Sequence, residues 1–322
     1  MRAMILAAGL GTRMEGLSQI CAKPALPVLG RPVIAWLLGW LARQGVSETA
    51  INLHHRPETI ERAVEAFGPE GLRIGYSREA APLGTGGGIA AMSDFLGRDD
   101  AALVLPGDMI LDCDLAPLVR QHLESRADCT LVLQERSSRN QDFGTIGIDD
   151  RGSLRRIAER FDLGAETRCG VFVGLRIVSP SLFREFPDLP PGVAFEDLSD
   201  WWAPRVRAGT ADIRGVLLDE NELLWQPVGT PAEYLAANLA PPRVSFLDPA
   251  EQAAPGTRVV GGDENLVIGP GAQISPSARL RRCVVWAGEA VPAHFDGEGG
   301  VFAHGNFYPC DANSEMLAGG RE

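Results

Sequence analysis

The sequence predicts an α/β protein with a doubly wound, mostly parallel β-sheet, followed by a short, left-handed β-helix-like segment near the C-terminus. Two observations lead to this fold class. Strand-like and helix-like patterns alternate through the first half of the chain, as they do in a parallel sheet that has helices on both faces. Nearer the C-terminus the apolar residues recur every six positions, which is typical of a β-helix.

The first half of the chain supplies the alternating elements. Residues 3–6 form an apolar run that suits a buried strand. Pro32 can begin the next helix and Gly45 can end it. Asp114 is placed to cap a later helix. The other expected elements are a strand at 50–53, a helix at 57–67, and strands at 72–76 and 101–105.

The second half is less regular and predicts added β-structure that would frame a second substrate. A helix is expected over residues 197–207, because Trp201, Trp202 and Val206 fall on one face. We interpret the two tryptophans as packing residues rather than as a stacking platform. The expected strands lie at 130–133, 145–148, 154–158 and 171–178.

A change of composition after residue 240 marks a domain boundary. Prolines predict a linker over residues 241–258, and the six-residue repeat occupies residues 259–292. A solenoid generally needs about three repeats for stability, so this short segment must lean on the preceding domain or on another subunit. Residues 293–322 are expected to form a polar, glycine-rich tail. The residues that mark the repeat are Ile268, Ile274, Leu280 and Trp286.

The composition favours a cytoplasmic enzyme. The chain has 322 residues, of which 45% are hydrophobic, and this suffices for sizeable cores. Its apolar stretches are all shorter than the ~18 residues needed to span a membrane. The net charge of −12 argues against a general nucleic-acid surface. The six cysteines lack paired or metal-binding spacings and are expected to be reduced, mostly buried thiols.

The stretch LAAGLGTRM, residues 6–14, predicts a phosphate-binding loop. Gly9 and Gly11 let the backbone turn tightly after the strand and bring its N–H groups close to an anion. Arg13 and Lys23 add two positive charges. A dinucleotide-binding fingerprint would need a third glycine, and a Walker A loop would need Gly-Lys-Ser/Thr, so neither alternative fits.

Two further sites carry candidate chemistry. Asp108 follows the expected strand at 101–105, and a carboxylate at the carboxyl end of a parallel strand suits a hard cation such as Mg²⁺. A lone Asp at such a place is otherwise most often a helix cap. The glycine run at 84–88 offers backbone against which a flat base can lie, or else forms a tight strand-to-helix turn.

Five motifs occur in one order along residues 1–240: LAAGLGTRM with KPALPVLGRPVIAWLL, then INLHH, PLGTGGGI, LPGDM and WQPVGTPAEYLAAN. Together they resemble the signature of the sugar-1-phosphate nucleotidyltransferases, the nucleotide-sugar pyrophosphorylases. The resemblance implies a Rossmann-like nucleotidyltransferase catalytic domain. It also implies transfer of a nucleotidyl group from a nucleoside triphosphate to a sugar 1-phosphate, with Mg²⁺ as cofactor and pyrophosphate as product. The motif variants resemble mannose-1-phosphate guanylyltransferases and favour GTP and mannose 1-phosphate, with a UTP-dependent uridylyltransferase as the alternative.

The resemblance also assigns residues to roles. Arg13, Lys23 and Asp108 would be catalytic, with Asp108 as the metal ligand. The implied partners are the two small substrates, without nucleic acid or membrane, and the C-terminal segment could form a homo-oligomer. The residues implied in nucleotide binding are Leu6, Ala7, Ala8, Gly9, Gly11, Thr12, Arg13, Pro82, Gly84, Thr85, Gly86 and Gly107. Those implied in binding the sugar phosphate are Gly144, Glu159, Arg160 and Gly170.

Three departures from the family pattern bear on activity. Pro227 stands where members commonly carry an Asp that is the second metal ligand, and a proline side chain cannot bind a metal. Glu15 brings a negative charge close to the expected triphosphate. Arg160 stands where many members have a lysine, and it keeps the charge without the compact geometry of an ammonium group.

The missing Asp leaves three interpretations open. Asp108 and the substrate phosphates could together hold the ion. A nearby carboxylate, Asp112, Asp219 or Glu222, could substitute for the missing ligand. The chain could instead be a catalytically weak regulatory homologue that binds a nucleotide or nucleotide sugar.

Overall fold

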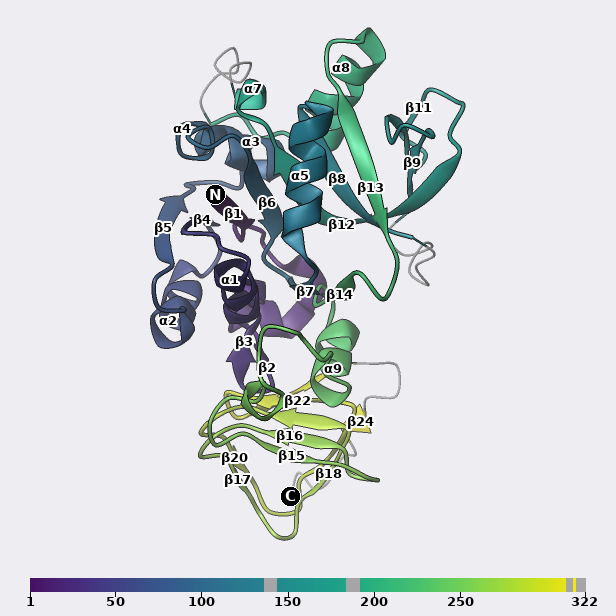
Figure 1. Ribbon diagram of the computed structural model, residues 1–322. Helices are drawn as coiled ribbons and strands as arrows, with labels where there is room; N and C mark the ends of the chain where they lie inside the picture. The colour runs from purple at the N-terminus through teal and green to yellow at the C-terminus, as the bar shows by residue number, and fades with distance from the viewer. Residues whose placement is uncertain (136–143, 184–191, 311–314, 317–322) are drawn as a thin grey trace.

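The structure is a computed structural model that describes residues 1–135, 144–183, 192–310 and 315–316 (Figure 1). The centre of its main sheet is parallel, with β1 between β4 and β6 and with β5 at the outer edge of β4. The chain thus adds strands on both sides of β1, and this switch point is where such sheets bind ligands. These strands are β1 (Arg2–Leu6), β4 (Glu48–Leu53), β5 (Arg73–Arg78) and β6 (Ala102–Pro106).

Helices cover both faces of this parallel centre, as predicted. Successive side chains of a strand point to opposite faces, so Ile5 packs with α1 and α2 in one core, whereas Met4 packs with α3 and α4 in the other. Gly45, at φ +79°, follows α1, and the Asp114 side chain caps α5, both as predicted. The helices are α1 (Val33–Arg43), α2 (Pro57–Phe67), α3 (Gly84–Ala91), α4 (Ser93–Leu96) and α5 (Leu115–Ser125).

The second half of the main sheet is largely antiparallel. Its long strand β12 pairs antiparallel with β6, β8 and β9, and β13 pairs parallel with β8. The helix expected over residues 197–207 is a π-helical turn, Asp197–Trp202, that continues into α8 (Ala203–Ala208). Strands and helix here are β8 (Cys129–Gln134), β9 (Ile146–Ile148), β10 (Leu154–Ile157), β11 (Phe161–Asp162), β12 (Arg168–Val178), α7 (Pro180–Phe183) and β13 (Ile213–Leu218).

Short elements connect the sheet to the site. The 3₁₀ helices η1 (Thr12–Gln19) and η2 (Lys23–Ala25) follow β1, and the hairpin of β2 (Pro27–Val28) and β3 (Arg31–Pro32) leads into α1. A separate two-stranded ribbon pairs β7 (Met109–Asp112) with β14 (Leu224–Pro227).

The C-terminal part forms stacked coils. Paired residues in its parallel strands, such as Leu266 with Cys283 and Gln273 with Ala290, are 17 positions apart, so each coil takes about three of the predicted six-residue repeats. The strands continue past residue 292, into the expected tail, through β23. They are β15 (Arg258–Val260), β16 (Leu266–Ile268), β17 (Gln273–Ile274), β18 (Arg279–Arg281), β19 (Cys283–Val285), β20 (Ala290–Val291), β21 (Asp296–Glu298), β22 (Gly300–Ala303), β23 (Asn306–Pro309) and β24 (Glu315–Met316).

The coil packs beneath the sheet-containing unit, with α9 (Pro231–Leu239) between them (Figure 1). A 3₁₀ turn, η5 (Pro249–Glu251), lies in the expected linker. The helices in the described part of the chain are all too short or too polar to cross a membrane.

Candidate active site

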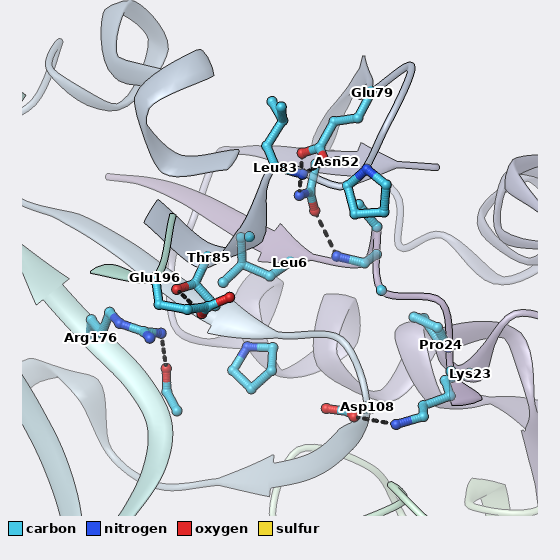
Figure 2. A pocket seen from close by; sticks show the side chains of 18 residues that line it. Leu6, Lys23, Pro24, Asn52, Glu79, Leu83, Thr85, Asp108, Arg176 and Glu196 are labelled. Carbon is cyan, nitrogen blue, oxygen red and sulfur yellow. Dashed lines mark hydrogen bonds and ion pairs between the residues drawn. The ribbon is translucent and has the colours of Figure 1, made fainter. Parts of the chain in front are cut away.

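A cavity of about 410 Å³ opens at the carboxyl ends of β1 and β6. The two strand ends lie side by side, because Leu6 pairs with Pro106 and the Gly107 N–H donates to the Leu6 carbonyl over 2.9 Å. Polar side chains gather in three places around the cavity (Figure 2). The predicted residues that line it are Leu6, Ala7, Ala8, Gly9, Gly11, Lys23, Pro82, Gly84, Thr85 and Asp108.

The first group of polar side chains fixes the predicted phosphate loop. Asn52, at the end of β4, accepts a hydrogen bond from Ala7 N at 2.6 Å and donates to one oxygen of Glu79 at 2.7 Å. The other Glu79 oxygen accepts from Leu83 N at 3.0 Å. Asn52 and Glu79 are both buried, so their polar atoms need these partners. The network ties the loop after β1 to the loop that precedes α3.

Gly9 and Gly11 both line the cavity. Among the described residues, no protein group accepts a hydrogen bond from the N–H of either glycine. Gly11 has φ +69°, a conformation that favours glycine. A Cβ at this position would lie 3.4 Å from the Lys23 Cγ, so the loop packs against the stem of that lysine.

The second group is the ion pair of Lys23 and Asp108, whose Nζ and Oδ2 lie 3.3 Å apart. The side chains are 12% and 31% exposed, so both face the cavity while the lysine stem stays covered. Lys23 is the single lysine of the chain, and the other 29 of its 30 basic residues are arginines. An ammonium side chain therefore occurs at one place only.

Pro227 lies beside this pair. The register of the ribbon places Pro227 opposite Met109, and the Val228 N–H donates to the Asp108 carbonyl over 2.8 Å. Asp112 is at the other end of the ribbon, opposite Leu224, where its carboxylate accepts hydrogen bonds from Ser245. At about 3.3 Å per residue it is roughly 13 Å along the strand from Asp108.

The other proposed substitutes for a second ligand lie at that distant end too. Asp112 and Glu222 line a different cavity, and the Glu222 N–H donates to Asp219. In the described part of the chain no cluster of three or more His, Cys, Asp or Glu side chains is arranged to hold a metal ion. Asp108 is thus the carboxylate that this end of the ribbon presents to the cavity.

The third group joins β12 to α3, and sequence reasoning predicted Thr85 in it but missed its acidic and basic members. The buried guanidinium of Arg176 forms an ion pair with the buried carboxylate of Asp197. The Thr85 hydroxyl lies 2.6 Å from Asp197 Oδ1 and 2.7 Å from Glu196 Oε2. These acidic and basic residues carry no local motif, because the antiparallel half of the sheet brings them together from distant segments.

The glycine run packs against the protein itself. A Cβ at Gly86 would lie 2.1 Å from the Phe195 ring, and the Gly86 N–H donates to the Phe195 carbonyl over 2.9 Å. Gly84, at φ +70°, begins α3 and lines the cavity. The run therefore forms the first turns of α3, with close packing at Gly86, whereas Gly84 lines the cavity.

Several predicted residues do not line this cavity. Thr12 and Arg13 line a separate one of about 630 Å³, together with Glu15. Gly107 lies under the strand ends, and Gly144 and Gly170 lie in the antiparallel half.

The charge of Arg160 acts on Asp200, whose carboxylate accepts a hydrogen bond from the Glu196 N–H. Hydrogen bonds from the Glu196 N–H and the Ser199 hydroxyl lower the pKa of Asp200, and the Arg160 charge lowers it further. Glu196 itself lines the cavity. The neighbouring Glu159 comes just before β11, and neither Glu159 nor Arg160 lines the main cavity.

The family model described as Nucleotidyl transferase matches residues 2–167, about half of the chain. The chain belongs to the nucleotidyl transferase family. The matched range contains the phosphate loop, Lys23 and Asp108, while Pro227 and the coil lie beyond it.

This nucleotidyl transferase is similar to a guanylyltransferase, a uridylyltransferase and a solved crystal structure. A mannose-1-phosphate guanylyltransferase of Mycobacterium tuberculosis is 29% identical over 306 residues, covering 90% of this chain and 81% of the relative. A UTP–glucose-1-phosphate uridylyltransferase of Synechocystis is 31% identical over 201 residues, covering 58% of this chain and 51% of the relative. The crystal structure of HddC from Yersinia pseudotuberculosis, complexed with GMP-PN, has a TM-score of 0.60 at 23% identity over 73% of this chain and 97% of HddC, and supports the fold.

Proposed function

We propose that this nucleotidyl transferase joins GTP and mannose 1-phosphate, giving a nucleotide sugar and pyrophosphate. The observation that carries the proposal is the Lys23–Asp108 pair, which lines the same cavity as the loop glycines Gly9 and Gly11. The choice of substrates rests on the guanylyltransferase named among the relatives that match most of the chain. UTP and glucose 1-phosphate are the second candidates, because of the uridylyltransferase relative.

The reaction needs positioned charge rather than a proton carrier. A sugar 1-phosphate oxygen is already anionic near neutral pH, so it can attack the α-phosphorus of the triphosphate without a general base, and the bond to pyrophosphate breaks. Loop N–H groups at Gly9 and Gly11 would hold phosphate oxygens. Lys23 would neutralise the charge that develops at the α-phosphate, and Arg13 the charge of the departing pyrophosphate.

We assign the predicted residues to two substrate subsites, of which the nucleotide subsite includes Thr12 and Arg13 from the separate cavity. The loop at residues 6–12, with Pro82, Gly84, Thr85, Gly86 and Gly107, would hold the nucleotide. Glu159 and Arg160, with Gly144 and Gly170 behind them, would hold the sugar phosphate near Glu196. Asn52 and Glu79 join the first subsite as residues that fix the loop.

Beside Lys23, the described residues offer a divalent metal ion only one carboxylate ligand from the protein. Asp108 offers one carboxylate that is shared with Lys23, and Mg²⁺ commonly binds one or two carboxylates together with substrate phosphates. When bound, such an ion would neutralise phosphate oxygens. We propose that Asp108 and the substrate phosphates hold it, since Asp112, Asp219 and Glu222 lie at the other end of the ribbon.

We propose that the catalytic domain covers residues 1–240, and that the linker covers 241–258. A left-handed coil then starts at 259 and continues to residue 309. The experiment that tests the function is pyrophosphate release by the full chain with Mg²⁺. GTP, UTP, dTTP, CTP and ATP are each combined with mannose 1-phosphate and glucose 1-phosphate. Turnover with GTP and mannose 1-phosphate above all other pairs is expected. Nucleotide binding without any turnover would instead identify a catalytically weak regulatory homologue.

A further inference from the structure

Residues 21–27, the segment that carries Lys23, form a wall that separates two cavities. Lys23 and Pro24 line the candidate active site, whereas Cys21 and Pro27 line a second cavity of about 240 Å³ on the other side. The coil closes this second cavity with residues that include Trp286. Ala22 and Leu26 are buried in the core that also contains α1 and α2, whereas the cavity leaves the coil side of the segment to discrete contacts.

Those contacts form a hydrogen-bond relay from the coil. Trp286 Nε1 donates to the Tyr234 hydroxyl over 2.9 Å, and that hydroxyl donates to the Pro27 carbonyl over 2.8 Å. Asn238 Nδ2 donates to the same carbonyl over 3.3 Å. Tyr234 and Asn238 are fully buried, and burial raises the pKa of Tyr234 well above its usual value, so the phenol keeps its proton.

The relay ends four residues from Lys23, in a stiff stretch of chain. Pro24 and Pro27 both have fixed φ angles. Between them the Leu26 N–H donates to the Lys23 carbonyl over 3.1 Å and closes the turn of η2. A displacement of the Pro27 carbonyl is therefore passed to Lys23 as movement of one rigid turn.

The coil also contacts η1, the helix that follows the phosphate loop. The Tyr308 ring packs on Gly16, where a Cβ would lie only 2.8 Å from the ring. Gly16 belongs to η1, the helix that carries Arg13. Pro309, next along the coil, lines the same cavity as Arg13. Contacts from one C-terminal unit thus reach the segments of both predicted phosphate-binding cations.

We propose that the C-terminal coil positions the active site, with Trp286 and Tyr234 as positioning residues that hold Lys23 against Asp108 through the Pro27 carbonyl. The effect on turnover rests on the function proposed above, but the placement of Lys23 does not. The coil then does more than complete the fold: it sets the geometry of a cation at the reacting phosphates.

The single lysine makes this placement measurable without an activity assay. Trace acetylation of the full chain with an isotopically labelled anhydride modifies Lys23 and the N-terminal amine, and mass spectrometry gives the ratio of the two. Tyr234→Phe keeps the ring and removes the bridging hydroxyl, while Trp286→Phe removes the indole donor. In both variants the labelling ratio is expected to rise about fivefold, the size expected for loss of one buried hydrogen bond.

The control variant weakens packing inside the coil, away from the contact with Tyr234. Leu280 is buried in the coil's own core on β18, which pairs with β21 rather than facing α9. Leu280→Ala is expected to lower the melting temperature but to leave the labelling ratio and kcat unchanged. Trp286→Phe and Tyr234→Phe are expected to lower kcat about fivefold at temperatures where all the variants are folded.

The labelling ratio tests the positioning role separately from the proposed function. An unchanged labelling ratio in Trp286→Phe, or an equal rise in Leu280→Ala, would overturn the positioning role, whether or not the wild-type protein turns over. A raised ratio confined to the relay variants supports it even if the wild type shows no turnover. In that case the failure belongs to the proposed function alone. Should Tyr234→Phe fail to fold, Trp286→Phe alone decides the outcome.

Discussion

The two sides of the candidate active site are built differently. On the side of the phosphate loop, the buried Asn52 and Glu79 use their oxygens and an amide donor to fix both loops that face the nucleotide subsite. On the other side, the Asp108 carboxylate is shared with Lys23. The adjacent strand supplies Pro227, whose side chain has no atom that can bind a metal ion. The protein pre-organises the first side, whereas substrates must complete the second. Nucleotide binding thus depends on the first side and turnover on the second.

The largest effect is expected from Lys23→Arg. The guanidinium is larger than the ammonium group and would displace the stem that packs on Gly11. Because one positioned donor at a transition state is worth about 3 kcal/mol, kcat should fall at least about a hundredfold in the pyrophosphate-release assay. Arg43→Lys, the reverse exchange at the end of α1, should leave kcat unchanged. Activity of Lys23→Arg within about threefold of wild type would show that Lys23 supplies charge only.

Restoring a second carboxylate beside Asp108 should change the need for metal. Pro227→Asp places an oxygen donor next to the metal subsite, so the Mg²⁺ concentration for half-maximal activity should fall about tenfold, which corresponds to about 1.4 kcal/mol. Pro227→Ala is the matched control, since it removes the ring without adding a ligand. Equal Mg²⁺ dependence of the two variants would mean that position 227 lies outside the metal subsite. Mn²⁺ binding, followed by electron paramagnetic resonance, gives a readout independent of turnover.

The pre-organised side should respond in stability as well as in binding. Glu79→Gln replaces one accepting oxygen with a donor, so either the Asn52 amide or the Leu83 N–H loses its partner. The free energy of unfolding in urea should fall by about 1–3 kcal/mol, and KM for the nucleotide should rise. Glu61→Gln, at an exposed pair with Arg78, should cost less than about 0.5 kcal/mol. Similar losses in the two variants would argue against a special role for Glu79.

The smallest expected effect is on the pH dependence of stability, and it arises from His122, a residue away from both sides of the site. His122 is buried, with ring nitrogens 2.8 Å from the Thr130 hydroxyl and 3.0 Å from that of Ser179. Burial lowers its pKa, so the folded chain binds fewer protons than the unfolded chain as the pH falls below about 6.5. This group's contribution to stability is therefore present above that pH and lost on acidification. His122→Gln should flatten the decrease measured by urea unfolding between pH 7 and pH 5, and an unchanged slope would contradict the assignment.

Local patterns predicted the parallel half of the fold well. The expected helix at 57–67 coincides with α2, and Asp114 and Gly45 occupy the expected cap positions. These features depend on neighbouring residues along the chain. The pairing of β12 with β6 depends on distant segments, so the antiparallel half was foreseen as strands without a register.

The same distinction applies to the candidate site. The phosphate loop and Asp108 have local signals, namely glycines after one strand and a carboxylate after another. Arg176 and Glu196 have none, because only the folded sheet brings them to the cavity. The role expected for the glycine run also changed at Gly86, since the sequence cannot show that Phe195 packs there.

In the proposed reaction, the site brings a sugar phosphate oxygen to the α-phosphorus of a nucleotide. The most direct measurement uses mannose 1-phosphate labelled with ¹⁸O on its phosphate, incubated with GTP, Mg²⁺ and the full chain. Mass spectrometry then locates the label. We expect a nucleotide sugar that retains all of the label, including the bridging oxygen, together with unlabelled pyrophosphate. Label in the pyrophosphate, or a nucleotide sugar that has lost its labelled bridge, would contradict the proposed reaction.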